Sequence, residues 1–344
     1  RNLINRDVKV SVLMLAYNQR PYIDEAIRSV VLQDTTFDFE LIVSDDASTD
    51  GTADRCLWWQ QRYPDRIRVI RGDSNVGLAA NFVRTYQAAR GEYIAICEAD
   101  DFWTDRHKLQ IQVDFLDTHP DYSACFHRVI NYYQADGSKS LSGGPARRTV
   151  TLADLSLCNP ITNVSVCYRH AVADFLPTWM DQVTSYDLVM HILCAEHGDI
   201  YYMRRIMAVY RKLETSIWTG GDKAKRAMIS LKNRDLLIAY FQDRNPEVCR
   251  TLQTANARNR IDMALYYEAQ DMADKAKECW QQVTLYRPDW TPDDLAHERR
   301  SLAVAARRPN ALRRMLTACR RRVSKWMALP HVKGKAQDCK MNKP

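Results

Sequence analysis

The first 130 residues alternate short apolar runs with longer segments whose apolar positions recur every three or four residues. Four of the short runs consist mainly of apolar residues, which predicts buried strands at residues 9–15, 39–43, 67–70 and 92–97. The longer segments place their apolar side chains on one face, which predicts helices at residues 21–33, 53–62 and 78–89. Because strands that alternate with helices are typical of a parallel sheet with crossover connections, we expect an α/β fold.

The pattern changes twice in the rest of the chain. From residue 121 to 220 one helix that begins near Asp187 is mixed with short apolar runs, which predict strands at residues 123–132, 165–168 and 200–209. Beyond Asp222 helix-forming residues dominate, and residues 261–286 resemble one helical hairpin of the tetratricopeptide type. We therefore expect an α/β domain followed by a mainly α-helical C-terminal region, with boundaries at residues 1–220, 221–298 and 299–344.

Positive charge is concentrated at the C-terminal end. The 344 residues carry a net charge of +7, but residues 299–344 hold fourteen Lys and Arg against one acid, Asp338. A basic tail with interspersed apolar residues favours an anionic membrane surface as a partner; a solvated helix end or an oligomer contact explains it equally well. No nucleic-acid recognition motif accompanies the charge, so no nucleic acid is expected as a partner.

Cysteine spacing and hydropathy bear on the cell compartment. The ten cysteines form no Cys-x-x-Cys pair, which argues against a zinc site or a disulfide framework and fits a reducing cytosol. No apolar run approaches the ~20 residues that cross a bilayer, and the first run passes into polar Asn18 without a cleavage site. We expect a cytoplasmic protein, peripheral on the inner face of the cell membrane if the tail binds lipid. Because the chain begins with Arg1, we also expect upstream sequence to be missing.

Two acidic loops follow predicted strands, where open α/β sheets bind their ligands. The first, residues 43–52, can offer a carboxylate to a base or a ribose, or it can simply cap the next helix. The second contains Glu98, Asp100 and Asp101. Three carboxylates at one strand end repel each other unless a cation shares the site, which favours Mg²⁺ or Mn²⁺. The alternative is the acidic N-terminus of a helix over residues 102–114.

The ordered series of motifs resembles a family 2 glycosyltransferase of the GT-A fold. The resemblance covers residues 8–220 and rests on residues 10–18, on Asp45, Asp46, Ser48, Asp50, Gly51 and Thr52, on Asn75, Val76 and Gly77, on residues 91–94, on Glu98, Asp100 and Asp101, on Trp103, Lys108, Leu109, Gln112, Phe115 and Leu116, on Asp187, His191, His197 and Gly198, and on Tyr210, Arg211 and Trp218. It implies a GT-A domain over residues 1–220, with a nucleotide-sugar half at 1–115 and an acceptor half at 116–220.

The resemblance also implies an activity. Such a protein is an inverting transferase that moves a sugar from a nucleotide-diphospho-sugar, most often a UDP-sugar, to an acceptor hydroxyl with the help of Mn²⁺ or Mg²⁺. The acceptor is expected to be a glycan or a lipid-linked acceptor in the synthesis of surface polysaccharide or glycoconjugate.

The resemblance assigns roles to residues by their position. Tyr17 is expected against the nucleobase and Asp46 hydrogen-bonded to it, while Asp101 binds the metal and Asp100 contacts the metal or the ribose. The full set of expected donor-binding residues is Ala16, Tyr17, Asn18, Asp46, Asn75, Gly77 and Asp100. Three further residues are candidate substrate contacts, namely Trp103, Trp218 and Arg211.

An inverting displacement needs one base on the face opposite the leaving group. The resemblance places Asp187 there, at the start of a helix in the acceptor half. Two alternatives stay open: Asp187 is only the N-cap of that helix, or the nearby Asp181 is the base. After Arg211 the family often has a His, whereas this chain has Lys212, so one of these two cations is left to offset the diphosphate charge.

Two rival functions can be weighed against this one. A nucleotidyltransferase needs a Gly-rich phosphate loop after the first strand, and residues 16–20 contain no glycine. A catalytically inactive glycosyltransferase-like scaffold or binding subunit fits the missing His and Leu15, which stands where the family often has a nucleotide-contacting Thr. We therefore expect an inverting glycosyltransferase, with the inactive relative as the alternative.

Overall fold

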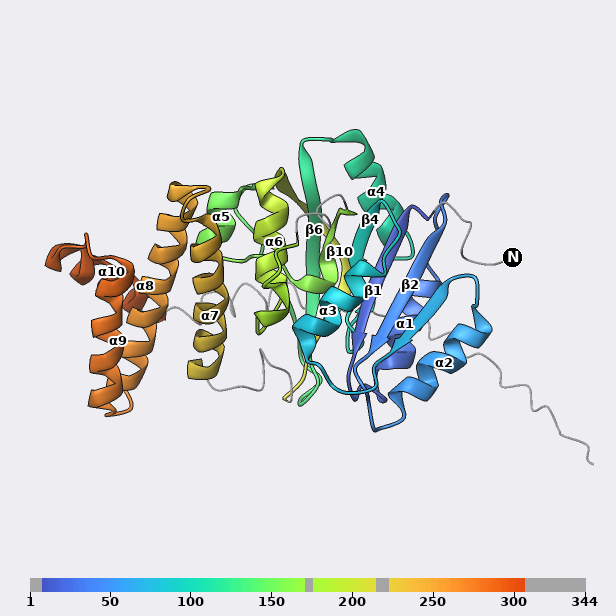
Figure 1. The fold of residues 1–344 in the computed structure, drawn as a ribbon, viewed down its shortest axis with the longest axis horizontal. Helices are drawn as coiled ribbons and strands as arrows, with labels where there is room; N and C mark the ends of the chain where they lie inside the picture. Colours follow the sequence, from blue (N-terminus) through green and yellow to red (C-terminus); the bar gives the residue numbers. More distant parts are fainter. Residues whose placement is uncertain (1–7, 171–175, 215–222, 307–344) are drawn as a thin grey trace, which may run out of the picture. The chain divides into compact units, whose positions relative to one another are not determined.

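One mixed β-sheet organises the α/β part of the chain (Figure 1). The structure, a computed structural model, describes residues 8–170, 176–214 and 223–306. In these residues the strand order is β3-β2-β1-β4-β9-β6-β10-β5, with β7 paired to β6 and β8 to β10. The strands are β1 (Val10–Ala16), β2 (Phe39–Asp45), β3 (Ile67–Arg71), β4 (Tyr93–Ile96), β5 (Phe102–Trp103), β6 (Tyr122–Tyr133), β7 (Lys139–Leu141), β8 (Thr149–Val150), β9 (Cys167–Arg169) and β10 (Asp199–Lys212).

The first four strands are parallel to one another, as the alternating sequence pattern predicts. Every residue of β1, β2 and β4 is buried, which explains why these strands read as mainly apolar runs. Gly91, just before β4, passes so close to β1 that an added Cβ would lie 2.4 Å from the backbone nitrogen of Ser11. The second half of the sheet is mixed, because β9 runs antiparallel between β4 and β6, while β6 and β10 are parallel.

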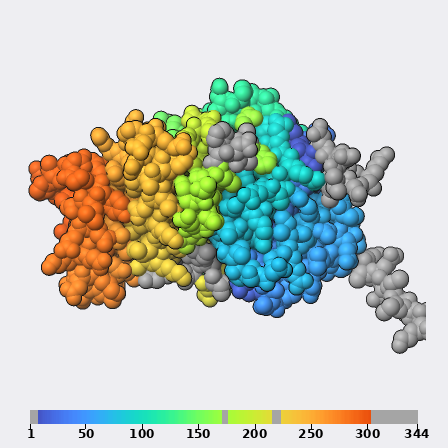
Figure 2. All heavy atoms as spheres, viewed as in Figure 1, coloured from blue at the N-terminus to red at the C-terminus, as the bar shows by residue number. Residues whose placement is uncertain are grey.

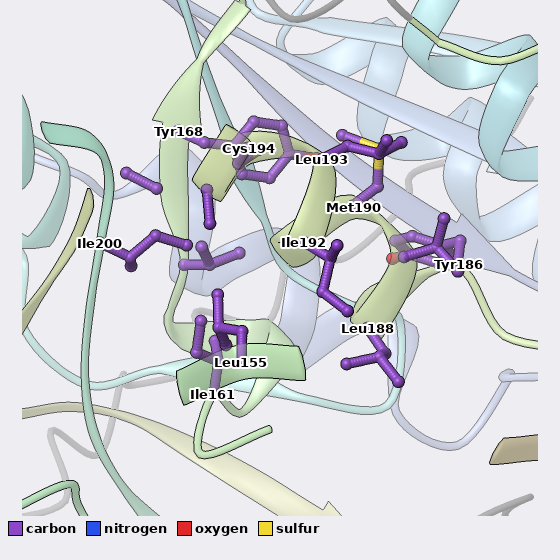
Figure 3. Packing of buried hydrophobic residues seen from close by; sticks show 14 of the residues in the cluster. Leu155, Ile161, Tyr168, Tyr186, Leu188, Met190, Ile192, Leu193, Cys194 and Ile200 are labelled. Carbon is purple, nitrogen blue, oxygen red and sulfur yellow. The ribbon is translucent and has the colours of Figure 1, made fainter. Parts of the chain in front are cut away.

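Helices cover both faces of the sheet. The apolar side chains of α1, α2 and α4 join one core cluster with β1, β2 and β4, and those of α3 and α6 join the cluster on the other face. Figure 3 shows the second cluster, where Leu155 and Tyr168 gather with side chains of α6 such as Ile192 and Cys194. These helices are α1 (Ile23–Val31), α2 (Thr52–Arg62), α3 (Leu78–Gln87), α4 (Lys108–Thr118), α5 (Leu152–Leu157) and α6 (Asp187–Glu196), with the short 3-10 helices η2 (Asn163–Ser165) and η4 (Met180–Gln182).

One predicted element is wrong. The helix expected over residues 102–114 begins only at Lys108, because Phe102 and Trp103 form β5 and pair with Val209 and Ala208 of β10. The acidic turn that precedes β5 is therefore not a helix N-terminus. The negative charge of this turn is therefore not stabilised by a helix dipole, which the alternative interpretation of the sequence required.

The C-terminal region is helical, as expected. It comprises α7 (Lys223–Phe241), α8 (Pro246–Glu268), α9 (Ala273–Tyr286) and α10 (Pro292–Ala306), and α8 with α9 forms the predicted hairpin. Leu237 and Phe241 of α7 belong to the same core cluster as α6, and Figure 2 shows the atoms of α7 directly against those of α6. A compact unit extends to Leu302, and most of the basic tail (residues 307–344) lies outside the described residues.

Two further observations concern the whole described chain. No helix in it is both long and apolar enough to span a membrane. The eight cysteines within the described part form no disulfide with one another, and seven of them are buried.

Candidate active site

The carboxyl ends of the parallel strands meet at one edge of the sheet and carry the predicted donor loops. Ala16 ends β1 directly opposite Asp45, the last residue of β2. Just beyond β1, Asn18 has φ 53°; its N–H donates to Ser48 Oγ at 2.9 Å and its Oδ1 accepts the N–H of Thr49 at 2.9 Å. The loops after β1 and β2 are therefore tied into one structure.

Asp46 holds the loop that follows β3. Its two carboxylate oxygens accept the backbone N–H groups of Val76 at 3.0 Å and Gly77 at 2.9 Å, and the residue is buried. Gly77 has φ 87°, which favours glycine, and Asn75 Oδ1 accepts the same N–H at 3.0 Å. The structure thus brings together Asp46, Asn75 and Gly77. Because each carboxylate oxygen has two lone pairs, Asp46 retains the capacity to accept a further hydrogen bond.

The acidic turn after β4 is fastened to β10. Asp101 is 2% exposed, and its Oδ1 accepts the backbone N–H of Arg211 at 2.7 Å. The Arg211 guanidinium donates to the carbonyl of Asp100 at 2.7 Å, to Glu25 at 2.7 Å and to Gln134 at 3.2 Å. Arg211 is itself buried. Arg211 therefore holds the acidic turn in place through its hydrogen bonds to Asp100 and Asp101. This role differs from the substrate contact expected from the sequence.

Four carboxylates share this corner, and we call Glu98, Asp100, Asp101 and Asp187 the acidic cluster. Burial raises the pKa of Asp101 well above its usual range, and the charges of Asp100 and Glu98 add to the rise. Burial also raises the pKa of Glu98 to about 7, with repulsion from Asp100 and Asp187 contributing. Burial raises the pKa of Tyr210 as well, and the charges of all four carboxylates add to the rise.

The donor set of the acidic cluster fits a divalent cation. No other described residue donates a hydrogen bond to Oδ2 of Asp101 or to the carboxylate of Asp100, and Mg²⁺ and Mn²⁺ prefer oxygen ligands of this kind. Across residues 8–170, 176–214 and 223–306, no three His, Cys, Asp or Glu side chains are placed to hold a metal by themselves. A cation at Asp101 would therefore take most of its ligands from water or from a bound phosphate.

Lys212 is a second cation beside the acidic cluster, in addition to Arg211. Burial lowers the pKa of Lys212 to about 8, while the charge of Asp101 opposes that shift. The Nζ atom of Lys212 lies 3.9 Å from the centroid of the Tyr210 ring. Because the Arg211 guanidinium is engaged with protein groups, Lys212 is the better placed of the two cations to meet an anionic ligand.

Asp187 is the first residue of α6, and the residues that lead to it, 184–187, form what we call the base segment. The N-cap of α6 is Tyr186, and no side-chain hydrogen bond caps the helix, so the alternative that Asp187 is only an N-cap is wrong. Asp187 Oδ1 accepts the Ser185 hydroxyl. The Tyr186 hydroxyl donates to Glu98 and accepts a hydrogen bond from Asn163 Nδ2 at 2.7 Å. The side chain of Tyr186 thus ties the base segment to Glu98, a member of the acidic cluster from the turn after β4.

The remaining predicted residues are placed as follows. Tyr17 is 47% exposed beside the donor loops. Trp103 is a correction: it is 4% exposed, its Nε1–H donates to the carbonyl of Val164 at 3.2 Å and Lys108 covers its ring, so it is a core residue and not a substrate contact. Trp218 lies outside the described residues. Asp181, the other candidate base, is exposed on η4.

Sequence reasoning missed the side chains that connect the two halves of the site. Asn163 donates to Glu98 Oε1 at 2.9 Å and to Tyr186, and the Tyr186 ring stacks on Phe82 of α3 with centroids 3.9 Å apart. Tyr186 directly precedes Asp187 in the chain, and that position is a signal that sequence analysis had at hand. Asn163 begins η2 and has no motif around it, so only the fold identifies it.

A cavity of about 720 Å³ is lined by residues between 131 and 162. Its wall includes Asn131 of β6 and Thr162, which precedes η2. Asn131 pairs in the sheet with Tyr210, and Thr162 adjoins Asn163, the residue that donates to Glu98. Asn131 and Thr162 therefore link the cavity wall to Tyr210 and Asn163, two residues that adjoin the acidic cluster.

Comparison with known proteins finds one family that part of the chain matches. Residues 11–168 match the family model described as Glycosyl transferase family 2. The uncharacterized protein Rv1520 of Mycobacterium tuberculosis is 40% identical over 220 residues, which are 63% of this chain and 62% of that protein. The match thus spans less than two thirds of the length of this relative.

Two solved structures have a similar fold. One is the mannosyltransferase PcManGT from Pyrobaculum calidifontis in complex with GDP-Man and Mn²⁺, with a TM-score of 0.57 and 18% identity, covering 92% of this chain and 85% of that one. The other is S. aureus TarS 1-349 in complex with UDP-GlcNAc, with a TM-score of 0.52 and 18% identity, covering 80% and 91%. Residues 11–168 thus resemble glycosyl transferase family 2, and the chain has the GT-A fold of these two solved glycosyltransferases.

Proposed function

We propose that this chain is an inverting glycosyltransferase that moves a sugar from a nucleotide-diphospho-sugar to an acceptor hydroxyl in glycan synthesis. One observation carries the proposal: the hydroxyl of Tyr186, which directly precedes Asp187 at the start of α6, donates to Glu98 of the turn that carries Asp100 and Asp101. Metal-binding carboxylates and a separate carboxylate base in one corner are what such a transfer requires.

The donor side of the site is built from the loops after β1, β2 and β3. We assign the nucleoside to the loops that carry Tyr17, Asn18 and Asp46, with the exposed Tyr17 ring against the base. Asp46 keeps the 75–77 loop in place through two backbone N–H groups, so the conformation of this loop is fixed before a donor binds. The sequence resemblance favours a UDP-sugar, but the solved relatives bind UDP-GlcNAc and GDP-Man, so both bases belong in the experiment.

The diphosphate is assigned to the acidic turn. Asp101, with Asp100 beside it, would hold a divalent cation, which would supply positive charge to offset that of the departing diphosphate. Arg211 fixes the turn through the backbone of Asp100 and the carboxylate of Asp101. Lys212 offers a second positive charge at the same corner, where the family often has a His.

Asp187 is assigned as the general base. It accepts the proton of the acceptor hydroxyl while that oxygen forms a bond to C1 of the sugar; the bond from C1 to the diphosphate oxygen breaks, and its electron pair leaves with the nucleoside diphosphate. The Ser185 hydroxyl orients the Asp187 carboxylate. We place the acceptor, a glycan or a lipid-linked glycan, in the cavity lined by Asn131 and Thr162. Contact of the basic tail with an anionic membrane surface is part of the same proposal.

Three variants test the proposal against a panel of UDP-GlcNAc, UDP-glucose and GDP-mannose with Mn²⁺, by release of nucleoside diphosphate. We expect Asp187→Asn to keep donor binding and to lose at least ~10²-fold in turnover. Asp101→Asn is expected to lose metal-dependent donor binding. Asp181→Asn, an exposed carboxylate on η4, is the matched control and is expected to behave as wild type. If wild type releases no nucleotide from any donor although it binds one, the inactive scaffold replaces this proposal.

A further inference from the structure

A polar side chain of the C-terminal helical region reaches the base segment. Asn233 lies within α7, is 1% exposed and is outside the part of the chain that matches the family model. Asparagine is a weak helix former, and a buried amide costs free energy unless its groups are hydrogen-bonded. Its presence in the middle of a buried helix face therefore calls for partners.

Both partners of Asn233 are backbone groups of the base segment. Its Nδ2 donates to the carbonyl of Ser185 at 2.6 Å, and its Oδ1 accepts the N–H of Thr184 at 3.0 Å. One amide group thus grips the backbone two and three residues before Asp187. A paired contact of this kind fixes the orientation of the backbone as well as its distance from α7.

The contact of Asn233 with Ser185 leads on to the Asp187 carboxylate through the Ser185 hydroxyl. The Ser185 hydroxyl donates to Asp187 Oδ1, while the next residue, Tyr186, is bonded to Glu98 and stacked on Phe82. The base segment is therefore held from two directions. The side chain of Tyr186 connects it to the acidic cluster, and Asn233 connects its backbone to α7.

We propose that Asn233 is a positioning residue for the catalytic base, and that α7 is consequently part of the catalytic unit. The inference rests on the proposed role of Asp187. A base must lie within hydrogen-bond reach of the proton that it takes, and a displacement of about 1 Å in such a group costs about 10²-fold in rate. Loss of the Asn233 amide frees the backbone at Thr184 and Ser185 and lets the carboxylate move.

A matched pair of variants separates positioning from stability. Asn233→Ala removes the grip. Asn256→Ala removes another fully buried asparagine, on α8, whose Nδ2 donates to Asp235 of α7 at 2.9 Å and makes no contact with the base segment. With the donor that the wild type hydrolyses fastest among UDP-GlcNAc, UDP-glucose and GDP-mannose, we expect Asn233→Ala to lower kcat 10- to 100-fold with KM for the donor unchanged. Asn256→Ala should keep both constants.

Two further measurements keep the outcomes distinct. In an Asp187→Asn background, Asn233→Ala should lower the rate no further, because the residue acts only through the base. Hydrogen exchange needs no donor: the Thr184 amide should exchange faster in Asn233→Ala than in Asn256→Ala. If Asp187→Asn itself has wild-type turnover, the proposed function fails. If Asp187→Asn is impaired but Asn233→Ala matches Asn256→Ala in kcat or in Thr184 exchange, the positioning role fails.

Discussion

The buried side chain of Lys108 leads to a prediction of how the free energy of unfolding depends on pH. Lys108, at the start of α4, is fully buried, its Nζ donates to Gln112 at 2.7 Å, and it lies 4.1 Å from the centroid of the Trp103 ring. Burial lowers its pKa from 10.5 to about 8, because the ammonium loses most of its hydration. Trp103 follows Asp101 by two residues, so Lys108 packs next to the acidic turn.

The direction of the pH effect follows from proton binding. Between pH 8 and pH 10.5 the unfolded chain still holds the proton that the folded chain has released from Lys108, so the free energy of unfolding rises with pH. As pH falls through 8 the ammonium becomes charged in both states and this stability is lost. Each pKa unit corresponds to about 1.4 kcal/mol, which gives a rise of about 3 kcal/mol over the interval.

Urea unfolding followed by tryptophan fluorescence from pH 7 to pH 10.5 measures this effect. We expect the wild type to gain about 3 kcal/mol relative to Lys108→Met over this range. Ionisation of cysteine and tyrosine side chains occurs in both proteins and cancels in the difference. Lys277→Met, which removes an exposed lysine of α9, provides the baseline for loss of a surface charge. A constant difference between wild type and Lys108→Met at every pH would refute the reasoning.

Two further changes test packing, the first at the edge of the sheet opposite the site and the second within the site. Gly91→Ala places a Cβ 2.4 Å from the nitrogen of Ser11 and 2.6 Å from the carbonyl carbon of Val10, so β1 must shift; we expect a loss of at least ~3 kcal/mol in urea unfolding, and a wild-type midpoint would disprove the contact. Tyr186→Phe keeps the ring on Phe82 but removes the hydroxyl bonded to Glu98; we expect a loss of about 2 kcal/mol by thermal unfolding, and an unchanged melting temperature would show that this hydrogen bond contributes nothing.

The local pattern was enough to predict the first, parallel half of the sheet. The strands expected at residues 9–15 and 39–43 correspond to β1 and β2, because buried parallel strands are read directly from mainly apolar runs. Their parallel register then places the loops after Ala16 and Asp45 side by side, so the grouping of the donor loops followed from the sequence. The acidic turn was equally visible, since carboxylates at a strand end are uncommon without a ligand.

The failures share a physical cause, which is that the deciding contacts are distant in sequence. Phe102 and Trp103 fit the start of a helix as well as a strand, and only pairing with β10 makes them a strand. The N-cap of α6 is Tyr186, and the hydroxyl of this residue donates to Glu98, which is far away in the chain. Asn233 carries no local signal at all, since its partners, Thr184 and Ser185, are on a different element.

The central claim is that the acidic cluster binds the donor diphosphate through a divalent cation held by Asp101. Electron paramagnetic resonance of free Mn²⁺ measures this directly, with the full chain titrated in the presence of UDP or GDP. We predict that wild type removes one equivalent of free Mn²⁺ when its nucleotide is present, and that Asp101→Asn removes none under the same conditions. Equal loss of free Mn²⁺ with the two proteins would contradict the account.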